Sequence, residues 1–168
     1  MARKPGSMYR YVRGKQSTRK EYMGGVPNPR ITQFVLGNRT DKFPYILSLI
    51  ATEKCNIRHN SLESARITIN RAMEKKAGPT NYRLHIRIFP HVVIRENKQA
   101  TGAGADRVSQ GMRSSFGKIV GTAAEVDRNQ IVATIETHEQ FIEPAKQALR
   151  KGGMKLSPPC KVDINKSS

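Results

Sequence analysis

The sequence is poor in the features that mark membrane, secreted and disulfide-bonded proteins. No tryptophan occurs in its 168 residues, and only 6% of them are aromatic. The main apolar cluster, residues 43–51, is much shorter than the roughly 18 residues that span a bilayer. The N-terminus has no apolar stretch of the kind found in signal peptides. The 2 cysteines can form one disulfide at most. We therefore expect reduced thiols at Cys55 and Cys160, and a cytoplasmic location.

Acidic residues are also scarce, and this imbalance dominates the composition. The chain has 13 Asp and Glu against 30 Lys and Arg, which gives a formal charge of +17. Such a charge destabilises a compact fold by self-repulsion unless a polyanion neutralises it. The length suits one domain with one long tail or loop. We therefore expect a nucleic-acid partner, with no membrane and no small-molecule substrate.

Residue patterns for catalysis and metal binding are missing as well. Cys55 and His59 form the only near pair of zinc-type ligands, which is too few for a zinc site. The glycines at 102 and 104 lack the third glycine of a dinucleotide-binding loop. The carboxylates that a metal-dependent nuclease needs in a cluster lie singly among basic residues: Glu96, Asp106, Glu125 and Asp127. The sequence predicts no enzyme, no cofactor and no metal.

The first 30 residues combine basic and tyrosine side chains with a single acid, Glu21. Lysine and arginine contact phosphates while tyrosine rings stack on unpaired bases, so this mixture suits irregular RNA. A disordered solubilising arm is the plainer alternative, but three tyrosines are unusual in such an arm. We predict a basic extension over residues 1–25. Its predicted RNA-binding residues are Arg3, Lys4, Tyr9, Arg10, Tyr11, Arg13, Lys15, Arg19 and Lys20.

From residue 26 to residue 168 the pattern predicts a single α+β domain. Turn residues precede a strand over 30–36. A helix is predicted from a capping box at residues 60–63 to a stop at 78–79, and a second helix over 139–151. Further strands are predicted over 82–89, 91–95, 119–126, 130–137 and 160–164. In this arrangement two helices cover a largely antiparallel sheet.

Two of the predicted elements carry a basic face. In the strand over 82–89, apolar residues alternate with cationic ones, so one side of the sheet faces the core and the other is basic. The side of the first helix away from its apolar positions has four basic groups with only Glu74 among them. A solvated helix face is the ordinary meaning of such charges, but their single sign favours phosphate binding. We predict RNA contacts at Arg66, Arg71, Arg83 and Arg87.

A glycine-rich run over residues 102–118 is the most unusual segment of the chain. It joins glycines, small residues and spaced basic groups, with almost no large apolar side chain. A segment of this composition cannot bury itself in a core. It is therefore suited to contact with an anionic partner, and nucleic acid is the partner that the charge of the whole chain favours.

Short motifs spread over nearly the whole chain resemble those of a known protein family. They are Tyr9–Tyr11, Gly25–Pro27, Ser64–Arg66, His85–Ile88, His91–Arg95, Gly102–Arg107 and Gly111–Lys118. In order and spacing they resemble the universal large-subunit ribosomal protein L-sixteen family, and more narrowly its archaeal and eukaryotic branch, L-ten-e or QM. The chain ends soon after Ile164 without the C-terminal extension of eukaryotic members, so it resembles an archaeal member.

The resemblance implies an α+β fold of the hammerhead type, placed in the large ribosomal subunit between the central protuberance and the peptidyl-transferase centre. It also implies that residues 98–113 form a flexible loop that reaches toward the acceptor ends of A- and P-site tRNA. The expected partners are large-subunit rRNA, tRNA and neighbouring large-subunit proteins. The expected tRNA-proximal residues are Lys98, Gly102, Gly104, Asp106, Arg107, Gly111 and Arg113, and Lys118 is expected to bind RNA.

Two other functions fit parts of the composition. A general nucleic-acid-coating protein would share the charge, but it would not need a long glycine-rich loop and would bind DNA and RNA similarly. An RNA-modifying enzyme or a nuclease would need a cluster of acidic or nucleophilic residues in a pocket, and the sequence contains no recognisable cluster of this kind.

Overall fold

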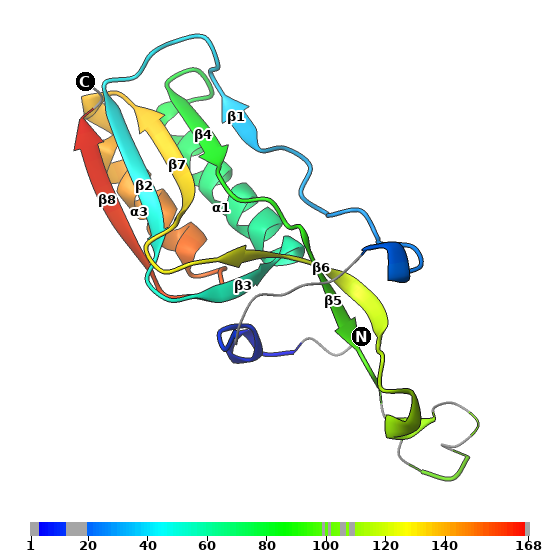
Figure 1. Cartoon of the computed structure of the whole chain (residues 1–168). Coiled ribbons are helices and arrows are strands. Elements are labelled where there is room, and N and C mark those ends of the chain that lie inside the picture. The colour runs from blue at the N-terminus through cyan, green and yellow to red at the C-terminus, as the bar shows by residue number, and fades with distance from the viewer. Residues whose placement is uncertain are drawn as a thin grey trace.

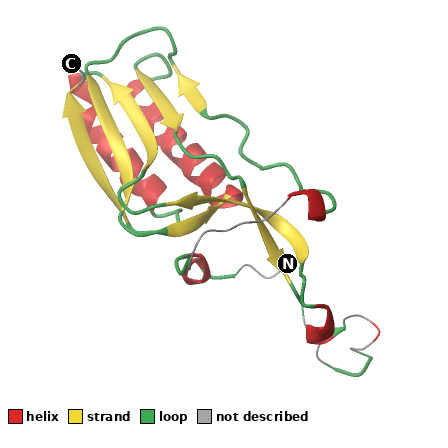
Figure 2. Ribbon diagram, in the orientation of Figure 1, coloured by secondary structure: helices red, strands yellow, loops and turns green. Residues whose placement is uncertain are grey.

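The computed structural model describes residues 4–12, 20–98, 100, 102–104, 107 and 110–166, apart from the side chain of Lys20. Two helices, α1 (His59–Ala77) and α3 (Ile142–Gly153), pack on each other and cover one face of a large antiparallel sheet (Figures 1 and 2). In the described part of the chain no helix covers the opposite face, which we call the open face. This arrangement confirms the predicted α+β class, with two helices on antiparallel strands.

The described strands form two sheets. The larger has the order β1 (Val35–Gly37), β4 (Tyr82–Ile86), β7 (Ile131–Thr137), β2 (Tyr45–Ala51), β8 (Cys160–Lys166). The smaller has the order β3 (Cys55–Arg58), β6 (Lys118–Val126), β5 (Val92–Glu96). All paired strands run antiparallel. Short 3-10 turns occur at η1 (Gly6–Tyr9), η2 (Lys20–Tyr22), η3 (Gly111–Ser114) and η4 (Glu139–Phe141).

The core lies between the larger sheet and the two helices. Strand β4 shows the underlying alternation: Tyr82, Leu84 and Ile86 are buried, whereas Arg83 and His85 are half-buried on the open face. The predicted division of this strand into an apolar and a cationic side is thus confirmed. The same core contains, among others, Leu47, Leu49, Leu62, Ile69, Met73, Ile135 and Leu149.

Strands β2 and β3 are missing from the sequence prediction, which left residues 43–51 as an apolar cluster. Strand β2 lies between β7 and β8 in the middle of the sheet. Most of its residues are buried or half-buried on both faces, as Leu47 and Ser48 show. A strand covered on both sides lacks the alternation that identifies a strand with one wet face, so its pattern gave no clear period.

The first helix begins differently from the prediction. Strand β3 runs directly into α1, so Arg58 with φ −64° and ψ 147° stands at the N-cap and makes no side-chain cap hydrogen bond. The capping box expected at residues 60–63 is therefore wrong, because these residues already lie in the first turn. The C-terminal stop is confirmed: Gly78 has φ 77°, and its N–H donates to the Glu74 carbonyl at 3.1 Å.

Other boundaries shift by a few residues. The strand expected over 30–36 begins only at Val35, and the one expected over 82–89 ends at Ile86. The second helix begins with η4 and continues to Gly153, with Pro144 in its first turn as predicted. The expected turn between β6 and β7 is confirmed, since Asn129 has φ 64° and the Gln130 N–H donates to the Asp127 carbonyl at 3.2 Å.

His59 joins the segment before β1 to the smaller sheet. Its ring is buried, and its Nδ1 accepts a hydrogen bond from the Arg30 N–H at 3.2 Å and lies 3.2 Å from Thr122 Oγ1. Burial, together with the neighbouring cations Arg58 and Arg30, lowers the pKa of His59. A neutral imidazole at the start of α1 therefore fixes where the N-terminal part of the chain meets the body.

Candidate nucleic-acid interface

The open face of the larger sheet presents two of the predicted RNA-binding arginines. The antiparallel register places Arg83 opposite Glu136 and His85 opposite Thr134. The Arg83 guanidinium forms an ion pair with the carboxylate of Glu136, a residue that is only 7% exposed. Arg87 follows directly after β4, and its Nε donates to Thr134 Oγ1 at 3.2 Å. Arg87 is exposed, so its charge faces solvent at the surface of the sheet.

The basic side of α1 is less uniform than the sequence indicated. Arg66 donates two hydrogen bonds to Glu63, at 2.9 and 2.5 Å, and its side chain is only 11% exposed. Arg66 lowers the pKa of Glu63, so the carboxylate stays ionised and balances the guanidinium. Arg71 and Lys75 are exposed instead. An RNA contact at Arg66 remains a prediction, but its charge is compensated within the protein.

The described N-terminal residues lie against the body of the protein. Arg10 forms an ion pair with Glu53 at 2.7 Å, and the ring of Tyr9 stacks under the Arg58 guanidinium at 5.6 Å from its centroid. Lys4 lies 3.9 Å from the Glu96 carboxylate. Tyr11 is 73% exposed. Several predicted RNA-binding groups lie outside the described residues: Arg3, Arg13, Lys15, Arg19 and the side chain of Lys20.

A hairpin of β5 and β6 extends away from the helix-covered body (Figure 1). Nine residues of β6 correspond to a length of roughly 30 Å. At its far end the Arg95 guanidinium lies 3.9 Å from the centroid of the Phe116 ring. Gly117 approaches the backbone of Glu96 so closely that an added Cβ would lie 2.5 Å from its carbonyl carbon. These contacts define the base from which the glycine-rich segment leaves.

The described residues of the glycine-rich segment lie at the surface. Lys98, Gly102, Gly104, Arg107 and Arg113 are exposed, and Gly111 is half-buried. The three glycines have positive φ values of 121°, 84° and 59°, a conformation that other residues adopt with strain. Asp106 lies outside the described residues. Lys118 is exposed at the first position of β6, opposite Glu96.

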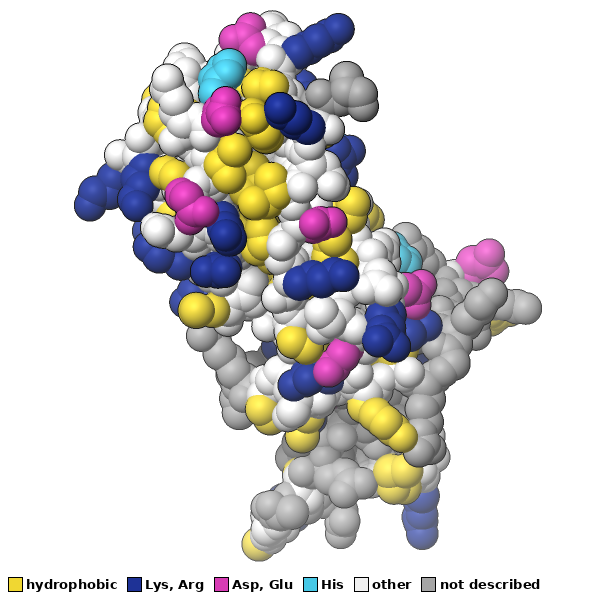
Figure 3. Space-filling view, turned by 90° about the vertical axis from the view of Figure 1, so that its left-hand side faces the viewer, with side chains coloured by type: hydrophobic (Ala, Val, Ile, Leu, Met, Phe, Trp, Pro, Cys, Tyr) yellow, Lys and Arg dark blue, Asp and Glu magenta, His cyan; other side chains and the backbone are white. Residues whose placement is uncertain are grey.

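Positive charge also occurs on the side of the molecule where β8 and α3 lie. Figure 3 shows Lys and Arg side chains on both sides of a hydrophobic strip on this side. Exposed apolar residues of this region include Met154, at 82%, and Ile164, at 40%. The cationic groups are thus spread over several surfaces instead of one patch, as expected of a protein that several nucleic-acid segments surround.

Comparison with protein families identifies this architecture. Residues 12–163 match the family described as ribosomal protein L16p/L10e. The chain belongs to this family. The match includes the open-face arginines, the basic helix α1 and the whole glycine-rich segment, and it confirms the resemblance found in the sequence motifs. The family consists of structural ribosomal proteins and is not enzymatic, as the sequence also predicts.

Individual relatives match along almost their whole length. The large ribosomal subunit protein uL16 of Methanosphaerula palustris is 55% identical over 99% of this chain and 96% of that protein. The protein of the same name from Methanocella arvoryzae is 52% identical over 100% of this chain and 98% of that protein. That of Thermoplasma volcanium is 50% identical over 99% and 94%. These relatives support the archaeal character that the motifs indicate.

The described residues contain no group of three or more His, Cys, Asp or Glu side chains placed to hold a metal ion. Glu125 and Asp127 instead share Lys54, whose Nζ lies 3.0 and 3.2 Å from their carboxylates. Cys55 and Cys160 are free thiols, and burial raises the pKa values to about 12 and about 11. Within the described ranges, no helix is long and apolar enough to cross a membrane.

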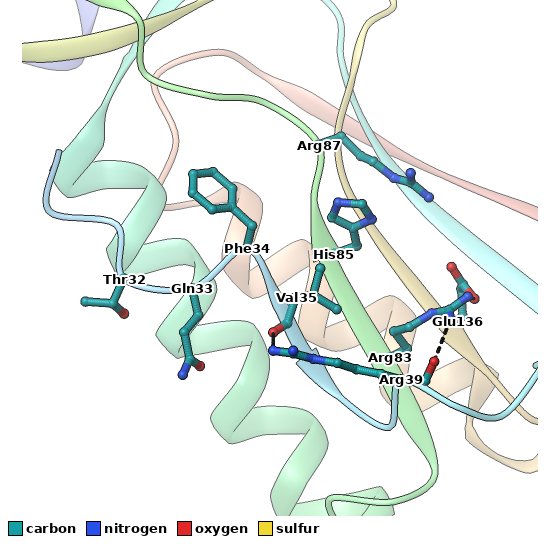
Figure 4. A pocket seen from close by; sticks show the side chains of 9 residues that line it. All are labelled: Thr32, Gln33, Phe34, Val35, Arg39, Arg83, His85, Arg87 and Glu136. Carbon is teal, nitrogen blue, oxygen red and sulfur yellow. Dashed lines mark hydrogen bonds and ion pairs between the residues drawn. The ribbon is translucent and has the colours of Figure 1, made fainter.

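Sequence reasoning missed one feature of the open face. A pocket of about 550 Å³ lies on the open face over β1, β4 and β7, and Phe34, Arg39 and Glu136 line it beside the predicted Arg83 and Arg87 (Figure 4). These residues lie far apart in the sequence. They meet only because β4 pairs with β1 on one side and with β7 on the other. No local pattern signals such a pocket.

Proposed function

We propose that the chain binds large-subunit rRNA between the central protuberance and the peptidyl-transferase centre and helps to position A- and P-site tRNA during translation. Membership of the L16p/L10e ribosomal family and the formal charge of +17 support the rRNA part. The tRNA part rests on the expected role of residues 98–113. The proposed partners are large-subunit rRNA, tRNA and neighbouring large-subunit proteins, in cytoplasmic ribosomes.

The β5–β6 hairpin is the observation that carries this proposal. It places the described residues of the glycine-rich segment at the far end of a two-stranded arm, away from the core (Figure 1). An arm of this kind lets the body rest on one RNA surface while the exposed Arg107 and Arg113 contact a second. Exposed arginines at positive-φ glycines suit close approach to phosphate groups, because the glycine backbone leaves room for the ligand.

The proposed function divides the chain into three working parts. Residues 1–25 form a basic extension that follows rRNA, and residues 26–168 form one domain that docks through Arg71, Arg83, Arg87 and Lys118. Residues 98–113 serve tRNA. Contacts with phosphates set the position of such a protein on RNA without reading sequence, so we expect retention that weakens steeply as salt rises.

Gradient fractionation of a tagged copy of the full chain tests this function directly. Cell extract is separated on sucrose gradients at rising salt, and the fraction that contains the protein is crosslinked to RNA. The proposal requires sedimentation with the large subunit and crosslinks from residues 98–113 to tRNA or to the catalytic centre. A light fraction free of RNA would contradict it.

A general nucleic-acid coat is the competing function, because the charge alone would support it. Affinities for RNA and DNA of equal length, measured at one salt concentration, separate the two. Equal affinities and no sedimentation with large subunits would favour the coat. A preference for RNA together with sedimentation would favour the ribosomal function.

A further inference from the structure

The pocket on the open face is a wide depression with the volume of a small-ligand site. Its volume of about 550 Å³ falls within the range of roughly 300 to 1,000 Å³ typical of ligand pockets. It is formed by the segment 32–35 on one side and by β4 on the other, with Glu136 of β7 behind them. None of its walls comes from the basic extension or from the glycine-rich loop.

The pocket carries positive charge that no carboxylate balances. Arg83 is paired with Glu136, but Arg39 and Arg87 form no ion pair among the described residues. Their hydrogen-bond partners are neutral: Arg39 donates to the Val35 carbonyl at 3.1 Å, and Arg87 donates to Thr134. Two exposed guanidinium groups thus remain for an anion, and guanidinium is well suited to phosphate.

The His85 ring adds a group that can donate to the same anion. In Figure 4 it lies between Phe34 and Arg87. Burial and the nearby Arg87 and Arg83 lower the pKa of His85, against the opposing effect of Glu136. Within the described residues its ring makes no hydrogen bond. A bound phosphate would reverse part of this shift, because it places negative charge beside the ring.

An aromatic surface borders the pocket beside these cations. Phe34 lines the pocket and stacks on Phe89 with ring centroids 5.6 Å apart and planes inclined by 27°. Phe89 is 54% exposed. Unpaired bases stack on exposed aromatic rings with little regard to sequence. Guanidinium groups for a phosphate and a ring for a base therefore meet within one pocket.

We propose that this pocket receives an unpaired nucleotide of large-subunit rRNA, with its base on Phe34 and its phosphate between Arg39 and Arg87. This inference rests on the proposed rRNA binding and adds a defined site to it. The Glu136 carboxylate holds Arg83 in place, and its remaining lone pairs can accept a hydrogen bond from a ribose hydroxyl or a base amino group. An acidic peptide could supply carboxylates for the two arginines, but it has no nucleobase to stack on the Phe34 ring.

Binding of short RNA to the full chain tests the site. The probes are a single-stranded oligoribonucleotide of mixed sequence, its fully paired duplex and adenosine monophosphate, each followed by fluorescence anisotropy or competition at fixed salt. The variants are Arg87→Ala and Phe34→Leu, the latter keeping an apolar group against the core. Lys161→Ala is the matched control, because it removes one exposed cation from β8, at the far edge of the sheet from the pocket.

We expect Arg87→Ala and Phe34→Leu each to weaken single-strand binding by about fivefold or more, and Lys161→Ala by less than about twofold. The difference should disappear on the duplex, which offers no unpaired base. Thermal unfolding of each variant checks that the fold is kept. Equal losses in Arg87→Ala and Lys161→Ala, with none in Phe34→Leu, would overturn the site. If adenosine monophosphate binds as tightly as the single-stranded RNA does, the pocket is a site for free nucleotides instead.

Crosslinking inside the ribosome separates this inference from the function on which it rests. Large subunits that contain 4-thiouridine should crosslink to the peptide that carries Phe34 in the wild-type protein, and not in Phe34→Leu. If the protein sediments with the subunit but this crosslink is absent, only the pocket proposal fails. If the wild-type protein does not sediment with the subunit at all, the proposed function fails first. An acidic peptide that displaces the RNA from the wild-type chain, and that binds the Phe34→Leu variant more weakly, would assign the pocket to a protein segment.

Discussion

Gly152 of α3 lies directly against the side chain of Ile69 of α1. A Cβ built on Gly152 would overlap the Ile69 side chain, whose outer atoms have no free space because the residue is fully buried. Gly153, the next residue, would place its Cβ 3.6 Å from Cys160 and from Leu49, which is ordinary contact. The two neighbouring glycines therefore differ. The close approach of the two helices requires a glycine at position 152, but it does not require one at position 153.

Gly152→Ala is expected to destabilise the protein by about 1–3 kcal/mol, the usual cost of overpacking a filled core. Gly153→Ala is the control, and it should leave stability unchanged or raise it by up to about 1 kcal/mol, because alanine favours helix. Urea unfolding in a high-salt buffer, which screens the net charge, measures both. Equal stability of the two variants would show that the helices can separate at Gly152 without cost.

Stability should fall as the pH drops below about 6.5. Burial and neighbouring arginines lower the pKa values of His59 and His85 below the ordinary value of 6.5. Between the folded and the unfolded pKa values the unfolded chain binds protons that the folded chain does not, so acidification favours unfolding. The stabilising contribution is complete above pH 6.5. Urea unfolding at pH 7.5, 6.5 and 5.5 measures the dependence of the free energy of unfolding on pH. His59→Gln should make this dependence weaker, and an unchanged dependence would exclude His59 as its source.

Arg107→Ala combined with Arg113→Ala should slow translation while leaving incorporation into the subunit largely intact. Both side chains are exposed on the glycine-rich segment, away from the surfaces of the body that we assign to rRNA. Arg128→Ala, which removes an exposed cation from the turn between β6 and β7, is the control for charge alone. Gradient fractionation and the rate of protein synthesis by purified ribosomes measure the two effects. Loss of incorporation with normal translation by the subunits that keep the protein would refute this division of roles.

Deletion of residues 1–20 should weaken retention on the subunit, because it removes several phosphate contacts. Contacts of this number contribute up to about a thousandfold in affinity, and that contribution is lost over a modest rise in salt. The same deletion should change the free energy of unfolding by less than about 1 kcal/mol, because the Arg10–Glu53 pair is a surface ion pair with both side chains about half exposed. A salt wash of purified large subunits and urea unfolding of the free chain measure the two effects. Unchanged retention through the wash would count against the extension.

Local patterns predicted much of the fold. The alternation in Tyr82–Ile86 and the helical spacing in α1 and α3 were enough, because each pattern compares residues only two to four positions apart. Strands β2 and β3 were missed for the opposite reason: burial on both faces leaves no polar side to mark the period. The start of α1 was misplaced because Glu63 resembles a capping residue, whereas its carboxylate pairs with Arg66.

The residues of the candidate site were also predicted only in part from the sequence. The sequence indicated Arg83, Arg87, the basic extension and the glycine-rich segment, since charge and glycine content are visible without a fold. It could not indicate that Glu136 neutralises Arg83, or that Phe34 and Arg39 complete a pocket with them. These groups come from three parts of the chain, in and around β1, β4 and β7, which are separated by dozens of positions.

The sequence by itself determined the strong positive charge, the α+β class, the family and the segments that carry spare cations. These properties depend on composition and on neighbours along the chain. Only the tertiary structure decided which cations keep their charge for a partner, because an ion pair forms across strands whose register no local pattern specifies. For the same reason, the tertiary structure alone placed Phe34, which stacks on Phe89, in one pocket with Arg87, which forms no ion pair among the described residues.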